Sequence, residues 1–485
     1  MKSHSITHIV FLFFTSTLAM TQSSLSLDQV LKQGREQSLA YHEASVNKKI
    51  VYLSNDLFKA GLKPQLNLNV NAPSFFKTSR EVTQPNGSII FQPLSQNYST
   101  ISLTGSQFIP QTGGEIFFYS DLQRFDDFNL DDRLYNGIPL RVGITQPIFG
   151  FNPYHHDKII QPLSLEVAEK QFNFDIEGIH LQVVDLYFDA LSAQANLEIA
   201  QTNLEINQKL IEIAQERYAL GKISENDLLQ LQLELNGARK SILRADIITK
   251  NATLILYTFL RQASDDKIEI PIFTIPEAPS SISLDKSLLF KEARKNRPEL
   301  SSLILEQAQL EKEYSKTSNE NGIQVGLFAS LGLARGSRNL ENIYTDPITE
   351  QQVSLSIAIP ILDWGKRKKS LQIIKEQQSL LHEKSATLDG QIESLLEQRI
   401  MFLIELEEEI TLQKEITKVS EKRFSISQER YVLGDISITD LTLAQREKDQ
   451  SKRDFINTMK DYWTTYYEIR QMSGYDFVQN KKITY

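Results

Sequence analysis

The sequence contains no cysteine, which excludes disulfides, thiolate metal ligands and lipidated cysteines. Beyond the N-terminus it has no apolar run of about 20 residues, so we expect no transmembrane helix in the mature chain, and any membrane crossing would have to use β-strands. Basic residues are outnumbered by acidic ones, and the net charge of −9 argues against a nucleic-acid partner. No linker rich in Pro, Gly or Ser divides the 485 residues into independent cores.

Catalytic and cofactor-binding patterns are also missing. We find no Ser/His/Asp arrangement, no phosphate-binding loop and no paired carboxylates in a pocket-forming context. His155 and His156 are adjacent, so on a helix they would not face one metal ion. We therefore predict that the protein is not an enzyme and needs no cofactor or metal.

What the sequence does have is a duplication. Residues 215–228 and 428–441 are identical at ten of fourteen positions, and Gly221 and Gly434 lie 213 residues apart. In each copy a long helical pattern stops at Leu-Gly-x-Ile-Ser, where Gly can adopt a positive φ and Ser can cap the next helix. Each half is therefore predicted to end in a helical hairpin with a defined tip.

The N-terminal segment predicts export. Lys2 precedes the apolar residues 9–14, and small and polar residues follow at 15–24, a pattern typical of a secretory signal peptide. We expect residues 1–22 to be removed, and a buried N-terminal helix is the alternative. The remaining chain divides into a first repeat at 23–280 and a second repeat at 281–485.

Each repeat begins with a predicted helix, at about 27–62 and 283–319, and continues into a segment with period 2. In the β segment 323–362, apolar residues alternate with small or polar ones from Val325 to Leu333 and again from Val353 to Ile359. The first repeat has the same frame, with an insertion within 72–138 that fits either an additional hairpin or a long folded loop. A sandwich strand and a barrel strand between lipid and water both give this alternation.

Long helices follow, at about 163–220 and 366–433, and each returns as a helix of about 35 residues. Two seven-residue stripes run along each long helix. In the second copy one stripe contains Ile410, Phe424 and Tyr431, and the other contains Leu412 and Leu433. Such stripes hold a helix against neighbours and impose a left-handed supercoil. Two stripes per helix predict a neighbour on each side, as in a closed tube.

This organisation resembles the TolC-like outer-membrane factor family over essentially the whole mature chain. The most specific elements are the two tips, 218–228 and 431–441, with Arg-Pro-Glu-Leu at 297–300 and Pro-Ile-Leu-Asp-Trp-Gly at 360–365. The resemblance implies a membrane α+β fold: a trimeric 12-stranded β-barrel, with four strands from each copy, continuous with a periplasmic α-helical barrel. It also implies the cell outer membrane, with a periplasmic extension, as the location.

The resemblance further implies a passive exit duct of a tripartite efflux or type I secretion system. A periplasmic adaptor, an inner-membrane transporter and outer-membrane lipid would be its partners. Drugs, metal ions and polypeptides remain possible cargoes. Two alternatives remain open: a periplasmic or surface coiled-coil protein without a channel would explain the heptads but not the strands, and a barrel enzyme or porin would explain the strands but not the long helices.

Three groups of candidate residues follow. At the entrance, Asp440 would form an acidic ring near the threefold axis, whereas a helix-start acid is the simpler interpretation; Ile436 and Leu443 stand where an arginine link and a second acid are expected. Aromatic residues at strand ends would lie at the membrane interface. The candidates are Leu220, Gly221, Ile223, Ser224, Leu433, Gly434, Ile436 and Ser437 for adaptor docking, Asp440, Asp227 and Tyr431 for the entrance, and Trp364, Phe149 and Phe151 for the membrane interface.

Overall fold

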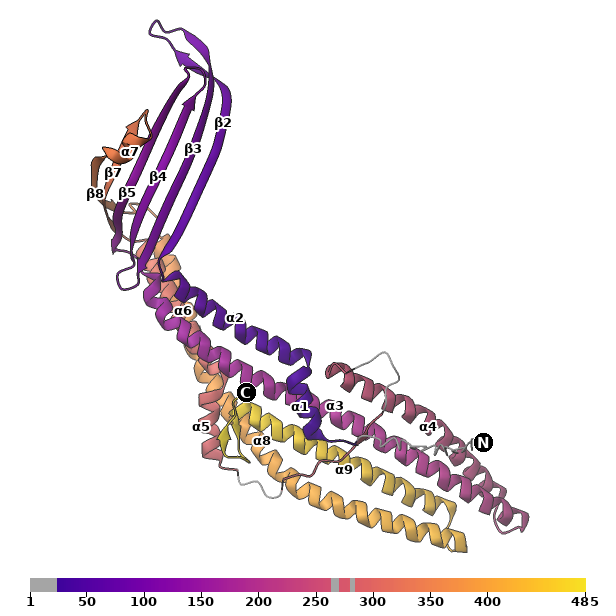
Figure 1. The fold of residues 1–485 in the computed structure, drawn as a ribbon. Coiled ribbons are helices and arrows are strands. Elements are labelled where there is room, and N and C mark those ends of the chain that lie inside the picture. Colours follow the sequence, from indigo (N-terminus) through magenta and orange to yellow (C-terminus); the bar gives the residue numbers. More distant parts are fainter. Residues whose placement is uncertain (1–23, 263–269, 280–283) are drawn as a thin grey trace, which may run out of the picture. The chain divides into compact units, whose positions relative to one another are not determined.

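The structure, a computed structural model, describes residues 24–262, 270–279 and 284–485 (Figure 1). The predicted signal peptide and the predicted repeat boundary near residue 280 lie outside the described residues. The chain forms two compact units. A helical unit takes the described parts of 1–42, 176–284 and 399–470, and a second unit, which contains the large sheet, takes 43–175, 285–398 and 471–485.

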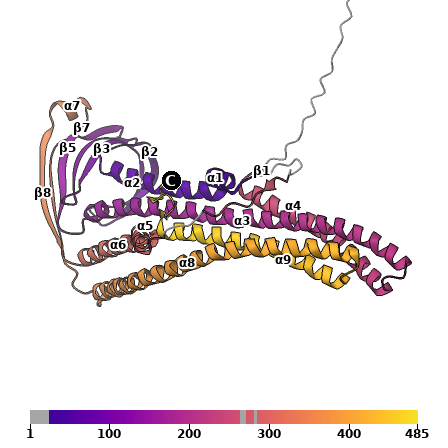
Figure 2. The ribbon, with the colours of Figure 1, turned by 90° about the horizontal axis from the view of Figure 1, so that it is seen from below.

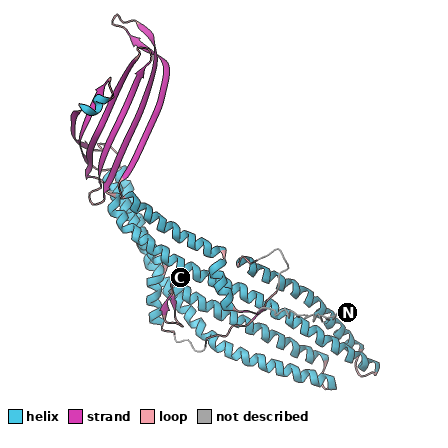
Figure 3. Ribbon diagram, viewed as in Figure 1, coloured by secondary structure: helices cyan, strands magenta, loops and turns pink. Residues whose placement is uncertain are grey.

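Helices make up most of the described chain (Figure 3). The two longest, α3 with 67 residues and α8 with 68, contribute long segments to both units. The helices are α1 (Leu27–Gln37), α2 (Leu39–Gly61), α3 (Pro153–Ala219), α4 (Glu225–Phe259), α5 (Lys286–Asn296), α6 (Pro298–Glu320), α7 (Glu341–Thr345), α8 (Lys366–Leu433) and α9 (Ile438–Ser473).

The helix that opens each repeat is broken, whereas the sequence pattern predicted a continuous one. Ser38 separates α1 from α2, and Arg297 separates α5 from α6. Both residues have extended backbones, with ψ of 154° and 126°. Pro298 starts α6 at a position where its missing N–H costs nothing. No glycine or proline marks the break at Ser38, so the periodicity alone did not predict it.

Four helices of the helical unit form one layer in the order α4, α3, α9, α8 (Figure 1). Polar contacts join each neighbouring pair, so the order follows from side-chain bonding as well as from the ribbon. Representative hydrogen bonds are Asn207 to the Glu234 carbonyl between α3 and α4 (3.3 Å), Lys452 to Glu198 between α3 and α9 (2.8 Å), and Gln413 to the Ser451 carbonyl between α8 and α9 (3.1 Å).

The two outer helices of this layer each expose an apolar stripe. On α8, Phe424 and Tyr431 are buried in a core cluster with residues of α3, α4 and α9, and Ile410 is buried as well. The second predicted stripe is exposed, and Leu412, Val419 and Ile426 line grooves beside the neighbouring α9. A similar stripe runs along α4. The exposed residues are Leu229, Leu233, Leu243 and Ile247 on α4, and Leu412, Val419, Ile426 and Leu433 on α8, all 48% or more exposed.

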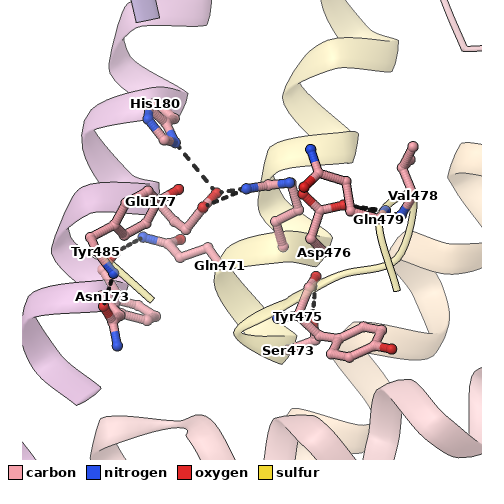
Figure 4. A network of polar contacts seen from close by, with 12 residues as sticks. Asn173, Glu177, His180, Gln471, Ser473, Tyr475, Asp476, Val478, Gln479 and Tyr485 are labelled. Atoms are coloured by element: carbon pink, nitrogen blue, oxygen red, sulfur yellow. Dashed lines mark hydrogen bonds and ion pairs between the residues drawn. The ribbon is translucent and has the colours of Figure 1, made fainter. Parts of the chain in front are cut away.

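A buried ion pair holds α3 to α9 near one end of the layer (Figure 4). The Glu177 carboxylate accepts hydrogen bonds from Arg470 at 3.0 and 3.2 Å, and His180 Nδ1 lies 3.6 Å from it. Burial opposes ionisation of Glu177, but His180 and Arg470 outweigh it and lower the pKa of Glu177 to about 2. The guanidinium of Arg470 also lies over the ring of Tyr467, 5.4 Å from its centroid.

The second unit contains one antiparallel sheet, curved as Figures 1 and 2 show, with the strand order β2-β3-β4-β5-β7-β8. Its two edges, β2 and β8, remain unpaired in the single chain. Two short pairs, β1–β6 and β9–β10, complete the described strands. The strands are β1 (Ser24–Leu25), β2 (Gln65–Thr83), β3 (Ile89–Ile109), β4 (Gly114–Asp127), β5 (Asp132–Phe149), β6 (Ile272–Phe273), β7 (Gln324–Ser337), β8 (Ile348–Ala358), β9 (Tyr475–Asp476) and β10 (Lys481–Lys482).

The sheet has six strands, whereas the family resemblance implied four from each copy. The difference is the insertion in the first repeat, which forms the hairpin β3–β4 and enters the sheet between β2 and β5. Its alternation is interrupted by Gly105 and Ser120 on the otherwise apolar face. That interruption is why period 2 did not distinguish a hairpin from a loop there.

Candidate functional site

The first helical tip ends α3 with paired backbone hydrogen bonds around Gly221. Gly221 has a φ of +64°, its N–H donates to the Tyr218 carbonyl (2.9 Å), and the N–H of Lys222 donates to the Arg217 carbonyl (2.9 Å). This is the Schellman arrangement, which satisfies the last carbonyls of a helix. Ser224 then caps α4, because its hydroxyl accepts the N–H of Asp227 (3.2 Å).

The second tip repeats this geometry. Gly434 has a φ of +93°, and its N–H donates to the Tyr431 carbonyl (3.0 Å). The hydroxyl of Ser437 accepts the backbone N–H of Asp440 (3.2 Å). The Asp440 carboxylate accepts the backbone N–H of Ser437 in return (3.2 Å), so the two residues form a capping box. The repeated motif thus builds the same turn twice.

The predicted docking residues divide into two sets. Leu220 and Leu433 are 70% and 75% exposed. In contrast, Ile223 and Ile436 are half-buried against a core cluster that joins both hairpins. Each tip therefore presents one apolar side chain outward and anchors itself with another.

Arg217 connects the two tips, and the sequence interpretation did not identify this role. Its guanidinium donates to the Tyr431 carbonyl at 2.9 Å and also to the carbonyl of Val432. It lies over the Tyr431 ring, 5.6 Å from the centroid. The only sequence signal is that an arginine precedes the tip tyrosine in both repeats, because Arg430 occupies the matching position.

The entrance candidates differ in their surroundings. Tyr431 is 4% exposed and packs in the core cluster between the hairpins. Asp440 is exposed, and hydrogen bonds from the hydroxyl and backbone N–H of Ser437 lower its pKa. Asp227 makes the equivalent capping contacts with Ser224. Both carboxylates thus lie in the first turn of a helix. A ring of carboxylates at an entrance would form only between several copies of the chain.

The interface candidates lie where the sheet meets the helices. Phe149 ends β5, is 64% exposed and pairs with Val325 of β7. Trp364 lies in the turn before α8 with a φ of +54° and is 89% exposed. Phe151 is half-buried, and its ring stacks on His156 at 5.8 Å. Trp364 and Phe149 therefore present aromatic surface at this end of the strands, and Phe151 packs inward.

Among the described residues, no helix is both long and apolar enough to cross a membrane. Within the same part of the chain, no cluster of three or more His, Cys, Asp or Glu side chains is placed to hold a metal ion.

The fold joins an amphipathic antiparallel sheet to a duplicated set of long helical hairpins. The chain belongs to the outer membrane efflux protein family, whose model matches residues 94–260 and 289–475. This family membership places the protein in the cell outer membrane. The match takes in both tips and five of the six strands of the sheet.

Known proteins of similar sequence or fold agree with this assignment. The alkaline protease secretion protein AprF of Pseudomonas aeruginosa is 21% identical over 276 residues, which cover 55% of this chain and 54% of AprF. The chain thus spans about half the length of this curated relative. The Campylobacter jejuni CmeC outer-membrane channel has a TM-score of 0.67 at 12% identity, covering 93% of this chain and 88% of CmeC. VceC of Vibrio cholerae has a TM-score of 0.64 at 14% identity, covering 93% and 96%.

Proposed function

We propose that the chain is the outer-membrane exit duct of a tripartite efflux or type I secretion system, and that it acts as a homotrimer. The observation that carries this proposal is the pair of exposed apolar stripes on α4 and α8, at opposite edges of one helical layer. Rows of exposed apolar side chains along a helix are a mark of an interaction site. Both stripes consist of aliphatic side chains, and they lie on different helices.

Two different edges lead to head-to-tail association, in which α4 of one copy packs against α8 of the next. Such heterologous contacts generate a closed ring when the rotation closes. Three copies, the number that the resemblance implies, bring together twelve helices at the tips. The heptad spacing of the α8 stripe suits a left-handed supercoil and so favours a tube of packed helices over a flat array.

The periplasmic partner of this tube is an adaptor protein, which would contact the tips. Leu220 and Leu433 supply exposed apolar contacts there, and the tight turns at Gly221 and Gly434 allow close approach of another helical hairpin. An inner-membrane transporter would supply energy through this adaptor. The similarity to an alkaline protease secretion protein favours a polypeptide among the possible cargoes.

The membrane part is the sheet. Its exposed apolar face includes Leu66, Val142 and Leu331, as a surface against lipid requires. Trp364 and Phe149 would lie at the level of the headgroups. A coiled-coil protein without a channel would leave this sheet unexplained, and its two unpaired edges are untenable in lipid unless further copies close them.

A double cysteine variant tests the ring. Leu243 follows Gly221 by 22 residues, and Leu412 precedes Gly434 by 22 residues. Because Arg217 links the two tips, both leucines lie at about the same distance from the tips along their helices. We expect Leu243→Cys combined with Leu412→Cys to form disulfide-linked dimers and trimers on oxidation in outer membranes. The native chain has no cysteine, and each single variant is a control, because a head-to-tail ring does not bring a position next to its own copy. A double variant that stays monomeric after oxidation would overturn the proposal.

A further inference from the structure

The inserted hairpin β3–β4 is an integral part of the sheet. Strand β3 is hydrogen-bonded to β2 from Gln65↔Ser106 to Thr83↔Ile89, and to β4 from Ile109↔Gly114 to Gln96↔Asp127. Strand β4 in turn pairs with β5 over nearly its whole length. Strands β2 and β5 are not hydrogen-bonded to each other, because the hairpin lies between them. Without the hairpin, the sheet of this structure would be interrupted between β2 and β5.

At the level of Leu66 and Asn67, the two faces of the sheet continue through the insertion; the register shifts lie further along, at Asn71/Ser74 and Tyr119/Asp121. Residues directly opposite one another across strands share a face. One row consists of polar or small residues with a single aromatic, and the row beside it, on the other face, is mainly apolar. The first row is Asn67, Thr104, Tyr119, Arg141, Gly332 and Glu350. The second is Leu66, Gly105, Phe118, Val142, Leu331 and Gln351.

Adjacent phenylalanines of β4 hold this strand to both of its neighbours, β3 within the insertion and β5 outside it. On the apolar face, Phe118 lies over Gly105 of β3, where a Cβ would be 2.0 Å from the ring. On the opposite face, Phe117 lies over Gly143 of β5, where a Cβ would be 2.5 Å away, and reaches Phe328 of β7 with a ring separation of 5.8 Å. A ring over a strand glycine is a device that fixes register. It occurs here on both sides of β4.

The free edges of this six-stranded sheet match each other. All neighbouring strands are antiparallel, so β2 and β8 run in opposite directions. Strand β8 of one copy can therefore pair with β2 of the next copy in the same antiparallel way. Every residue of β8 is exposed, and its outward backbone groups require partners in lipid. We propose that β8–β2 pairing between three copies closes an 18-stranded barrel, wide enough to release polypeptide segments that already contain helical structure. This inference rests on the proposed trimeric duct.

The strand count sets the width. With strands about 4.8 Å apart and tilted by about 40°, 18 strands enclose a backbone cylinder about 36 Å across, and 12 strands enclose one about 24 Å across. Side chains occupy about 5 Å on each side, so the lumens are about 26 Å and about 14 Å wide. A helix with its side chains is about 10–12 Å across. The wider lumen passes a helical hairpin, whereas the narrower one passes a single helix.

Cysteine labelling along β3 tests whether the insertion is part of the barrel wall. Ile101 and Leu103 belong to the apolar face, and Ser102 and Thr104 to the polar face. In outer membranes, a membrane-impermeant maleimide should label Ser102→Cys and Thr104→Cys and leave Ile101→Cys and Leu103→Cys unlabelled. Labelling of all four positions in a protein that still forms the Leu243–Leu412 cross-linked trimer would overturn the 18-stranded barrel and leave the duct intact. If that cross-link does not form, the proposed trimeric duct is overturned as well.

A deletion tests the width. Removing residues 84–127 joins β2 to β5 through the turn at 128–131 and leaves four strands in each copy. In planar bilayers, a neutral polymer of about 10 Å radius, added at the barrel mouth, should enter the parent channel and lower its current, and should be excluded from the deletion variant. The variant is compared only as a cross-linked trimer. Equal polymer entry in the two channels, or exclusion from the parent, would overturn the proposal, and the labelling pattern decides independently if the variant does not fold.

Discussion

The guanidinium of Arg217, at the end of α3, donates a 2.9 Å hydrogen bond to the carbonyl oxygen of Tyr431, at the end of α8. The last carbonyls of a helix lack partners within it, and the positive charge favours the negative end of the helix dipole. Arg217 thereby adds a second donor to the Tyr431 carbonyl, which also accepts the N–H of Gly434, and donates to the Val432 carbonyl as well. The two tips of one chain are thus joined directly by hydrogen bonds from Arg217.

We predict that Arg217→Lys loosens the second tip although it retains the charge. Lysine has no planar fork and cannot contact two successive carbonyls at once. A hydrogen bond from a charged donor contributes about 1.5 kcal/mol or more, so amide exchange around Gly434 should become about tenfold faster. Hydrogen-exchange mass spectrometry measures this. Arg430→Lys, at the exposed matching position of the other repeat, is the control and should leave exchange at both tips unchanged.

Features with a local cause were predictable from sequence. The turns at Gly221 and Gly434, the capping role of Ser224 and the seven-residue stripes depend on residues within one or two helical turns, and the structure contains each of them. The bounds predicted for α8 also agree with the structure. Local signals are sufficient there because Gly, Ser and apolar periodicity each act on their own segment.

Features with a tertiary cause were not predictable. Whether 72–138 holds strands depended on Phe118 covering Gly105 from the next strand, which no alternation of β3 alone reveals. The role of Arg217 depended on the second tip, 213 residues later, lying beside the first. Similarly, Glu177 appears in the sequence as one more helical acid, and only the packing of α9 against α3 shows it to be buried and paired.

We predict that Gly221→Val and Gly434→Val each preserve trimer formation and abolish export. Both glycines have positive φ, where a β-branched residue is strained, so the turn must change its shape. The strands of the large sheet belong to the other compact unit and should form as before. The measurement is the amount of cargo released, compared with the amount of cross-linked trimer in the outer membrane.

The matched control for the tip glycines is Gly390→Val within α8. Gly390 has no atom within 4 Å of an added Cβ and no positive φ, so the same side chain enters there without strain. Valine has a slightly higher helix propensity than glycine, so the substitution should change helix stability by less than about 1 kcal/mol, in the stabilising direction, and leave export intact. Export that survives both tip substitutions would show that the tips are not the adaptor-docking site.

The Glu177–Arg470 ion pair predicts an acid-sensitive helical unit. The pKa of Glu177 falls from 4.5 to about 2 on folding, so the carboxylate stabilises the folded state above pH 4.5 by about 3 kcal/mol. That stabilisation is lost as pH falls from about 4.5 to about 2. We expect Glu177→Gln to lower the melting temperature at pH 7 by several degrees and to melt close to the parent near pH 2. Glu205→Gln, at an exposed position of α3, is the control for thermal melting followed by circular dichroism and should match the parent throughout.

Two substitutions at Asp440 separate its capping role from its charge. Asp440→Ala removes both the cap and the charge, whereas Asp440→Asn removes the charge and keeps an oxygen that can accept the N–H of Ser437. If three copies approach the threefold axis, either variant should lower cation selectivity by about twofold, since exposed charges in water interact by about 1 kcal/mol or less. Only Asp440→Ala should also destabilise the first turn of α9, because it removes the acceptor for the N–H of Ser437. Asp227→Asn is the matched control and should change selectivity less. Single-channel reversal potentials in asymmetric salt measure the effect, and an unchanged potential for Asp440→Asn would leave Asp440 with its capping role alone.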